Sequence, residues 1–185
     1  GQPMNVVDLG GNVGFFTLRF IDLARRQGRD KLSYRITSVE GSPTIAKELR
    51  RRIHLTEGVE SSVSIVHGLV GKRSGSAKIT ENEFHPMSTI MHQDRYGVSV
   101  PYVDLNSVLA TGKPIHLLKC DIEGAELQFI ENYPDLLRNV ESAVFELHPE
   151  VCDTDRCIHL LKAAGLARCE FLRKTKDVMV AYFLR

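Results

Sequence analysis

The chain has 185 residues, of which 43% are hydrophobic and 25% charged, and its 24 Lys and Arg nearly balance its 23 Asp and Glu. This length and composition fit one compact domain, and they exclude intrinsic disorder and a polyelectrolyte-binding protein. Because the charges nearly balance, we do not expect a nucleic acid as partner. The longest apolar run, residues 178–184, is far shorter than the roughly 20 residues of a membrane-spanning helix, so we do not expect a membrane as partner either.

The first half of the chain repeats a strand, a turn and a helix. Residues 4–9 are apolar apart from Asn5 and Asp8, which indicates a strand buried on both faces. From residue 13 onward apolar residues recur at helical spacing until Gly28, where a helix is expected to end. A second strand is predicted at 34–39, and Ser42 with Pro43 then forms a helix start.

The second half continues the alternation. We predict strands at 63–69, 115–120 and 142–147, with a helix around 125–132 between the last two. Asp153 or Thr154 can cap a further helix that Gly165 closes, and residues 169–172 and 178–184 form an antiparallel hairpin. This order predicts an α/β fold in which a mostly parallel sheet carries helices on both faces.

Residues 70–114 interrupt this rhythm. They hold a Gly/Ser-rich turn at 71–76, the run His85-Pro86-Met87-Ser88 with His92, and a short helix predicted at 105–110. Long connections inside a compact domain are usually functional. We expect a single domain, 1–185, in which 70–114 is a hairpin-bearing insertion near the active-site rim.

The cysteines and the first residues bear on the cellular setting. The four cysteines lack C-x-x-C spacing and a histidine partner set, so reduced thiols are expected rather than a zinc site. No basic segment followed by an apolar one opens the chain, which favours a cytoplasmic location. Because Gly1 directly precedes the first predicted strand, we expect the natural chain to begin further upstream.

The stretch VVDLGGNVG, residues 6–14, indicates a cofactor site. A dinucleotide site needs G-x-G-x-x-G, but counting from Gly10 the other two glycine positions hold Asn12 and Phe15, and the Gly-Lys-Ser/Thr of a P-loop is also missing. The remaining pattern, Asp8-x-Gly10-x-Asn12-x-Gly14, suits S-adenosylmethionine, which carries no phosphate. Asp8 could accept hydrogen bonds from its ammonium, directly or through water.

Acids follow other predicted strands at the same edge of the sheet. Glu40, at the end of the second strand, is placed to accept both hydroxyls of a ribose. Asp121 and Glu123 follow the fourth strand, and Glu146 and His148 end the fifth. Acids in a first helical turn also stabilise the helix dipole, which explains Glu123 and Glu126 without chemistry.

Taken together, these pieces resemble the FkbM-type family of S-adenosylmethionine-dependent methyltransferases. Four motifs carry the resemblance: VVDLGGNVGFFTL at 6–18, SVEGSP at 38–43, LLKCDIEGAE at 117–126 and VFELHPE at 144–150. The resemblance implies a Rossmann-like, seven-stranded class I methyltransferase sheet whose last strand is antiparallel. It implies that the cofactor is lined by Asp8, Gly10, Asn12, Gly14 and Glu40, and we assign Gly41 and Ser42 of the second motif to the same site. Asp121 would lie near the transferred methyl group.

A hydroxyl acceptor, on a small molecule or a glycan, needs a base as well as alignment with the methyl carbon. We predict His148 as that base or as an acceptor-orienting group, Asp121 as the residue that organises the methyl end, and Glu123 and Glu146 as acceptor-binding groups. Alternatively, Asp121, Glu123 and Glu146 could gather a divalent cation.

Three other functions are compatible with parts of the pattern. A non-catalytic module of the same fold would bind S-adenosylmethionine without turnover. A nicotinamide-dependent oxidoreductase is disfavoured by the missing glycines. The arginines at 50–52 could contact nucleic acid, but a solvated helix face explains them more simply.

Overall fold

A seven-stranded sheet forms the centre of the computed structural model, which describes residues 2–80, 89–90, 97–109 and 112–185. Its strand order is β3-β2-β1-β7-β8-β10-β9. These strands are β1 (Met4–Leu9), β2 (Tyr34–Glu40), β3 (Val63–His67), β7 (Leu117–Cys120), β8 (Ser142–Leu147), β9 (Arg168–Lys174) and β10 (Met179–Leu184). The first five are parallel, and β10 pairs antiparallel with β8 and β9. The predicted Rossmann-like sheet with a terminal antiparallel hairpin is therefore confirmed.

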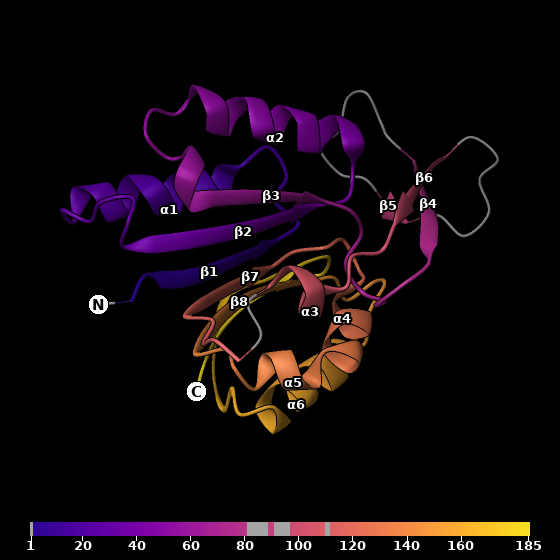
Figure 1. The fold of residues 1–185 in the computed structure, drawn as a ribbon. Coiled ribbons are helices and arrows are strands. Elements are labelled where there is room, and N and C mark those ends of the chain that lie inside the picture. The colour runs from indigo at the N-terminus through magenta and orange to yellow at the C-terminus, as the bar shows by residue number, and fades with distance from the viewer. Residues whose placement is uncertain (1, 81–88, 91–96, 110–111) are drawn as a thin grey trace.

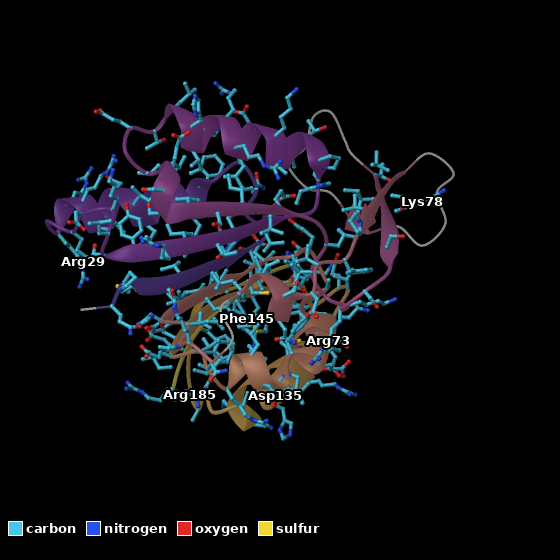
Figure 2. All side chains as sticks on the ribbon, in the orientation of Figure 1. Arg29, Arg73, Lys78, Asp135, Phe145 and Arg185 are labelled. Atoms are coloured by element: carbon cyan, nitrogen blue, oxygen red, sulfur yellow. The ribbon has the colours of Figure 1, made fainter. Side chains whose placement is uncertain are left out.

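Helices cover both faces of this sheet (Figure 1). On one side lie α1 (Phe15–Arg26) and α2 (Pro43–Leu55), and on the other α4 (Glu126–Asn132), α5 (Pro134–Leu137) and α6 (Thr154–Ala163). Short helices η1 (Glu60–Ser62) and α3 (Leu105–Val108) lie in the connections. Alternate residues of β1 separate the two cores, since Val6 packs with the α1 and α2 side while Val7 packs with Phe145 on the other. Figure 2 shows Phe145 in the interior.

Local signals set the helix starts. The Ser42 hydroxyl accepts a hydrogen bond from the Ile45 N–H at 3.2 Å, and Pro43 follows it at the first helical position. Asp153 caps α6 in the same way through the Arg156 N–H at 2.9 Å. By contrast, α1 begins at Phe15 rather than at residue 13, because Gly14 lies in the left-handed region with φ 94°.

Two predicted strands are shorter than expected. The third ends at His67, and Leu69 beyond it forms an isolated bridge with Tyr102. The fourth starts at Leu117, and Ile115 before it bridges to Val140. In both cases the apolar run extends beyond the regular ladder, because Leu69 and Ile115 are still buried.

The interrupting segment forms a second, three-stranded sheet with the order β5-β4-β6. Its strands are β4 (Ser76–Thr80), β5 (Thr89–Ile90) and β6 (Val98–Pro101), and all its pairings are antiparallel. Leu69, Ile79 and Val100 form a small core of its own. The predicted helix at 105–110 is seen as α3, and the run from His85 to Ser88, His92 and residue 110 lie outside the described residues.

The two termini and the small sheet lie at opposite ends of the large sheet (Figure 1). Since β1 starts near the N-terminus, the small sheet stands beside the carboxyl ends of the parallel strands, where ligands bind in open α/β sheets. Over the described parts of the chain, no helix is long and apolar enough to cross a membrane.

Candidate active site

The turn between β1 and α1 packs against the chain that follows β7. The N–H groups of Gly10 and Gly11 both donate to the Val39 carbonyl, at 2.9 and 3.0 Å. Gly10 has φ 76°, and a Cβ at this position would lie 1.7 Å from the Asp121 carbonyl oxygen. Only glycine fits a left-handed turn in such close contact with another backbone. Asn12 follows with φ 48°, a conformation that asparagine tolerates better than most residues.

Asp8 is fully buried beneath this turn. Its carboxylate accepts hydrogen bonds from the Thr17 hydroxyl at 2.8 Å and the Ser38 hydroxyl at 3.4 Å, and the Lys119 ammonium lies 3.4 Å away. Burial raises the pKa of Asp8, although Lys119 opposes the shift. Because no part of Asp8 is exposed, the geometry offers no direct contact with the cofactor ammonium, and the predicted contact through water stays a prediction. Asp8 supports the turn from below instead.

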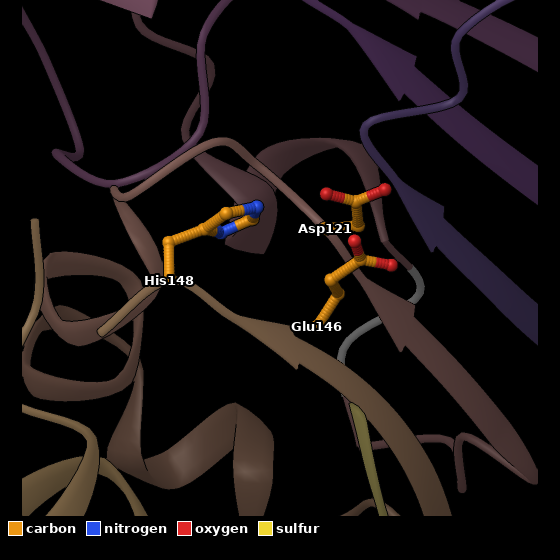
Figure 3. Close-up of side chains that lie close together, drawn as sticks. All are labelled: Asp121, Glu146 and His148. Atoms are coloured by element: carbon orange, nitrogen blue, oxygen red, sulfur yellow. The ribbon is translucent and has the colours of Figure 1, made fainter. Parts of the chain in front are cut away.

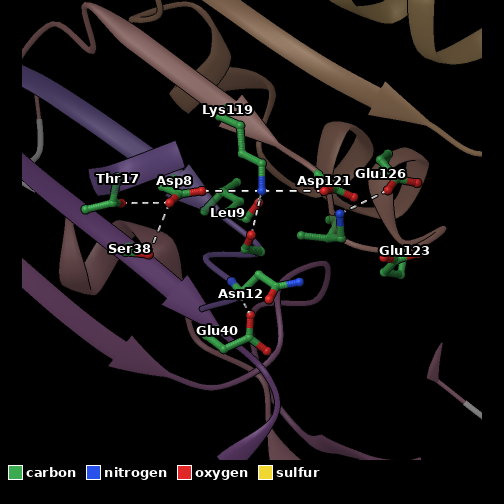
Figure 4. Close-up of polar contacts among 12 residues, drawn as sticks. Asp8, Leu9, Asn12, Thr17, Ser38, Glu40, Lys119, Asp121, Glu123 and Glu126 are labelled. Atoms are coloured by element: carbon green, nitrogen blue, oxygen red, sulfur yellow. Dashed lines mark hydrogen bonds and ion pairs between the residues drawn. The ribbon is translucent and has the colours of Figure 1, made fainter. Parts of the chain in front are cut away.

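Lys119 joins this turn to Asp121 (Figure 4). Its ammonium donates to the carbonyls of Leu9 and Gly10 and lies 3.6 Å from the Asp121 carboxylate. Although burial lowers it, the charges of Asp8 and Asp121 leave the pKa of Lys119 above its ordinary value. The sequence interpretation missed this residue. A lysine inside the apolar run LLKC was the available signal, because a buried charge needs partners.

Glu40 links two backbone turns at the end of β2. One carboxylate oxygen accepts the Asn12 N–H and the other accepts the Ser42 N–H, both at 2.8 Å. Burial raises the pKa of Glu40, and these two backbone hydrogen bonds oppose the shift. Each carboxylate oxygen has a further lone pair, so the side chain can still accept hydrogen bonds from a ligand.

A cavity opens beside Glu40 and encloses about 610 Å³ of space, including its mouth. The residues that line it come from the ends of four strands, β1, β2, β3 and β7, and from β4: Gly10, Asn12, Val39, Glu40, Gly41, Ser42, Gly68, Leu69, Val70, Ile79, Asp121, Ile122 and Glu123. Seven of them are predicted site residues, whereas Gly14 packs against Leu49 at the start of α1. None of the described residues that line the cavity is a lysine or an arginine.

A cluster of side chains adjoins the cavity at Asp121. Ligand-type atoms of Asp121, Glu146 and His148 all lie within 4.8 Å of one another (Figure 3). Asp121 is held at the end of β7 by its N–H, which donates to the Leu9 carbonyl at 3.1 Å. Burial, reinforced by the charge of Asp121, raises the pKa of Glu146. The structure thus brings together the two predicted catalytic residues and one predicted acceptor-binding residue. We call these three residues the acid–imidazole cluster.

Glu126 orients the histidine of this cluster. Its fully buried carboxylate accepts the N–H groups of Ile122 and Gly124, both at 3.1 Å, and lies 3.2 Å from Nδ1 of His148. Nε2 of His148 lies 3.5 Å from the Glu123 carboxylate. Sequence reasoning explained Glu126 by the helix dipole alone and missed this role, since its histidine partner is 22 positions further along the chain.

The same contacts change the expectation for His148. The hydrogen bond with Glu126 raises the pKa of His148 to about 9, against the effect of burial, and the charges of Glu126, Glu123 and Asp121 add to the rise. With these partners the imidazole is protonated at neutral pH, so the base role predicted from its ordinary pKa is disfavoured. The geometry favours the alternative in which His148 orients the acceptor.

The sequence matches a methyltransferase family. The family model described as the methyltransferase FkbM domain matches residues 8–168 of the sequence. In a search of curated proteins, no sequence matches.

Several solved structures share the fold. The methyltransferase FkbM from Methylobacillus flagellatus KT is 15% identical with a TM-score of 0.64, and the match covers 98% of this chain and 43% of that one. Precorrin-6y C5,15-methyltransferase from Geobacter metallireducens GS-15 is 11% identical with a TM-score of 0.59, over 100% and 81%. The N-terminal domain of EvdMO1, crystallised with SAH and D-fucose, is 14% identical with a TM-score of 0.54, over 98% and 76%. At these identities the likeness concerns the fold.

Proposed function

The chain belongs to the FkbM family of S-adenosylmethionine-dependent methyltransferases, and on this premise we propose that it methylates a hydroxyl group of a small molecule, sugar or other metabolite. The chain spans 43% of the length of the M. flagellatus FkbM protein, so the acceptor and the activity of the whole protein belong to this proposal.

The cavity offers S-adenosylmethionine hydrogen-bond acceptors and apolar surface. Glu40 offers two carboxylate oxygens to a ribose diol, and Leu69, Val70 and Ile79 offer apolar surface to a flat base. The missing lysines and arginines among the described lining residues agree with a cofactor that carries no phosphate. We therefore assign Glu40, Gly41, Ser42, Gly10 and Asn12 to the cofactor.

Asp121 carries the proposal, because it belongs to both halves of the site. It lines the cavity with Glu40, and it lies within 4.8 Å of Glu146 and His148 in the acid–imidazole cluster. An acceptor held by this cluster would meet a cofactor held by the cavity at Asp121. Such alignment supplies much of the rate enhancement in a bimolecular displacement.

The proposed reaction is an in-line displacement. The acceptor oxygen bonds the methyl carbon while the carbon–sulfur bond of the sulfonium breaks, and the hydroxyl proton passes to a basic group of the site or to water. S-adenosylmethionine supplies the electrophilic methyl group. The chain supplies His148 to hold the acceptor oxygen, Asp121 to organise the methyl end, and Glu123 and Glu146 to bind the remainder of the acceptor.

The substitution Asp121→Ala tests this assignment. We expect methyl transfer to fall at least about 100-fold, because Asp121 aligns the reacting groups and a misplacement of about 1 Å can cost about 10² in rate. The affinity for S-adenosylhomocysteine (SAH), the demethylated form of the cofactor, is measured by calorimetry. It should stay within a few-fold of the wild-type value, because Glu40 and the β1–α1 turn remain. Transfer of labelled methyl groups onto a panel of hydroxylated acceptors, D-fucose among them, provides the rate.

A matched substitution, Asp135→Ala, removes an exposed carboxylate from α5 and should leave both quantities unchanged. An Asp121→Ala protein that turns over at the wild-type rate removes Asp121 from the mechanism. Wild-type protein that binds SAH but methylates no acceptor of the panel would instead favour the non-catalytic binding module.

A further inference from the structure

The acid–imidazole cluster has the dimensions of a metal site. Its three ligand-type atoms, two carboxylate oxygens and one imidazole nitrogen, lie within 4.8 Å of one another. Ligands at the usual 2.0 to 2.2 Å from a cation lie at most about 4.4 Å apart. Three atoms 4.8 Å apart lie about 2.8 Å from their common centre, so a movement of about 0.6 Å or less would bring all three into bonding distance of one ion. The side chains come from the ends of neighbouring strands, so the backbone already holds them together (Figure 3).

The histidine is prepared for such a role by Glu126. Metal-binding histidines almost always direct their second ring nitrogen to a carboxylate or carbonyl, which fixes the ring and the tautomer. His148 has this arrangement, with Nδ1 at 3.2 Å from a carboxylate that is fully buried. Nε2 is then the nitrogen that can face a cation, and binding would release the proton that Nε2 carries in the metal-free protein, as metal binding to a protonated ligand does. The two N–H groups that Glu126 also accepts, from Ile122 and Gly124, fix the carboxylate itself.

Two carboxylates at this site, Asp121 of the cluster and the adjoining Glu126, each have one oxygen that lacks a hydrogen-bond partner among the described residues. Lys119 faces Oδ2 of Asp121 at 3.6 Å, but Oδ1 of the same group is buried and has no hydrogen-bond partner among the described residues. The buried oxygen Oε2 of Glu126 is likewise without one in that part of the chain. A buried carboxylate oxygen without a partner is costly, and a cation is the partner that best offsets several carboxylates at once.

We propose that Asp121, Glu146 and His148 bind one divalent transition-metal cation, with Glu126 as the positioning residue that holds His148. One imidazole with two carboxylates suits Mn²⁺, Fe²⁺ or Zn²⁺ better than Ca²⁺, which takes oxygen ligands alone. Three protein ligands leave coordination positions open. An acceptor hydroxyl bound there would lose its proton more readily, which is the help that an O-methyl transfer needs. This catalytic role rests on the proposed function, whereas the binding of the cation does not.

Mn²⁺ binding tests the site directly. The chain, freed of metals with a chelator and dialysed, is titrated with MnCl₂ while electron paramagnetic resonance follows the signal of free Mn²⁺. We expect one bound Mn²⁺ per chain. Asp121→Asn and Glu146→Gln keep the shapes of the side chains and should each weaken binding at least about tenfold. Loss of an outer partner typically costs about 10- to 100-fold in affinity, so Glu126→Gln should also weaken it.

Asp135→Asn is the matched control, since this carboxylate is exposed on α5 (Figure 2). It should bind Mn²⁺ as the wild type does. Thermal unfolding identifies any variant that has lost its fold. If either Asp121→Asn or Glu146→Gln has done so, the Mn²⁺ affinity of the other one decides whether the site exists. The cation site is overturned if the wild type shows no saturable binding, or if the folded ligand variants bind as tightly as the control.

Calorimetry with SAH on the same samples separates the two proposals. Protein that binds SAH but no Mn²⁺ overturns the cation site and leaves the transferase standing. Protein that binds one Mn²⁺ through these residues but neither binds SAH nor transfers a methyl group supports the cation site and overturns the proposed function.

Discussion

Lys119 shows how single residues tie the two halves of the site together. It pairs in register with Asp8 on the neighbouring strand, and Asp8 pairs in turn with Ser38, so the three side chains share one face of the sheet. The ammonium can therefore contact Asp8, the Gly10 carbonyl and Asp121 at once. A displacement of the β1–α1 turn would therefore be transmitted through the Lys119 ammonium to Asp121 of the acid–imidazole cluster.

Replacing this charge should weaken both the fold and the cofactor site. Lys119→Met leaves the carboxylate of Asp8 buried without its ion-pair partner, and breaking a buried pair costs about 3 to 5 kcal/mol. We expect chemical denaturation to show a loss at the lower end of this range, because the lysine side chain is 14% exposed. SAH affinity, measured well below the unfolding transition, should fall at least about tenfold because the Gly10 carbonyl loses its donor.

Lys162→Met is the matched control, because this lysine is exposed on α6 and should change stability by no more than about 0.5 kcal/mol. A folded Lys119→Met protein with wild-type SAH affinity would show that the ammonium serves stability alone.

At the residue scale, the predictable part of the site is the part set by short motifs. Gly10, Asn12 and Glu40 line the cavity as their positions after strands suggested. The roles of Lys119 and Glu126 were out of reach, because their partners are distant in sequence: Lys119 and Gly10 are 109 positions apart. No pattern in one sequence identifies which buried charges meet. The same reason explains why Asp8 could be placed near the cofactor turn but not beneath it.

At the scale of elements, the β1–α1 unit was predictable because its signals are local. Glycines on either side of α1 have left-handed conformations, Gly10 with φ 76° in the turn after β1 and Gly28 with φ 71° after the helix. Helix α5 and strand β5 were not resolved from the sequence, whereas a hairpin was expected in the segment that forms the small sheet. The four residues of α5 and the two of β5 are too short to show a period.

These two glycines allow a controlled test of the turn. In Gly28→Ala the new Cβ meets nothing within 4 Å, so only the left-handed conformation is penalised, by about 1 to 2 kcal/mol. In Gly10→Ala the same penalty applies, and the Cβ would also lie 1.7 Å from the Asp121 carbonyl oxygen. We expect Gly10→Ala to cost at least about 2 kcal/mol more than Gly28→Ala, measured by urea denaturation. Equal losses would mean that the turn can move away from Asp121 without cost.

At the scale of the whole molecule, the order of strands and helices predicted the architecture. Alternating units required a parallel sheet, and the apolar tail about a polar turn required a hairpin at its edge. Which segments the end of the chain would touch was not predictable. Arg185 follows β10, and its guanidinium donates to the carbonyls of Val140 at 3.0 Å, Leu137 at 3.1 Å and Ala164 at 3.3 Å. It thus joins the hairpin to the ends of α5 and α6.

Arg185 should therefore contribute measurably to global stability. The carbonyls at helix ends lack partners within their own helices, so Arg185→Ala leaves those of Leu137 and Ala164 without their donor. Hydrogen bonds to charged groups are worth about 1.5 to 3 kcal/mol each when buried, and these are only partly buried, so we expect a total loss of about 2 kcal/mol. Arg185→Lys keeps the charge but cannot span three carbonyls, and it should recover less than half of the loss. Arg29→Ala removes an exposed arginine from the loop after α1 and should be neutral in the same denaturation experiment. If Arg185→Ala were as stable as Arg29→Ala, the carbonyls would be satisfied by water, and the hairpin would be held to the helices by the apolar side chains of β10 alone.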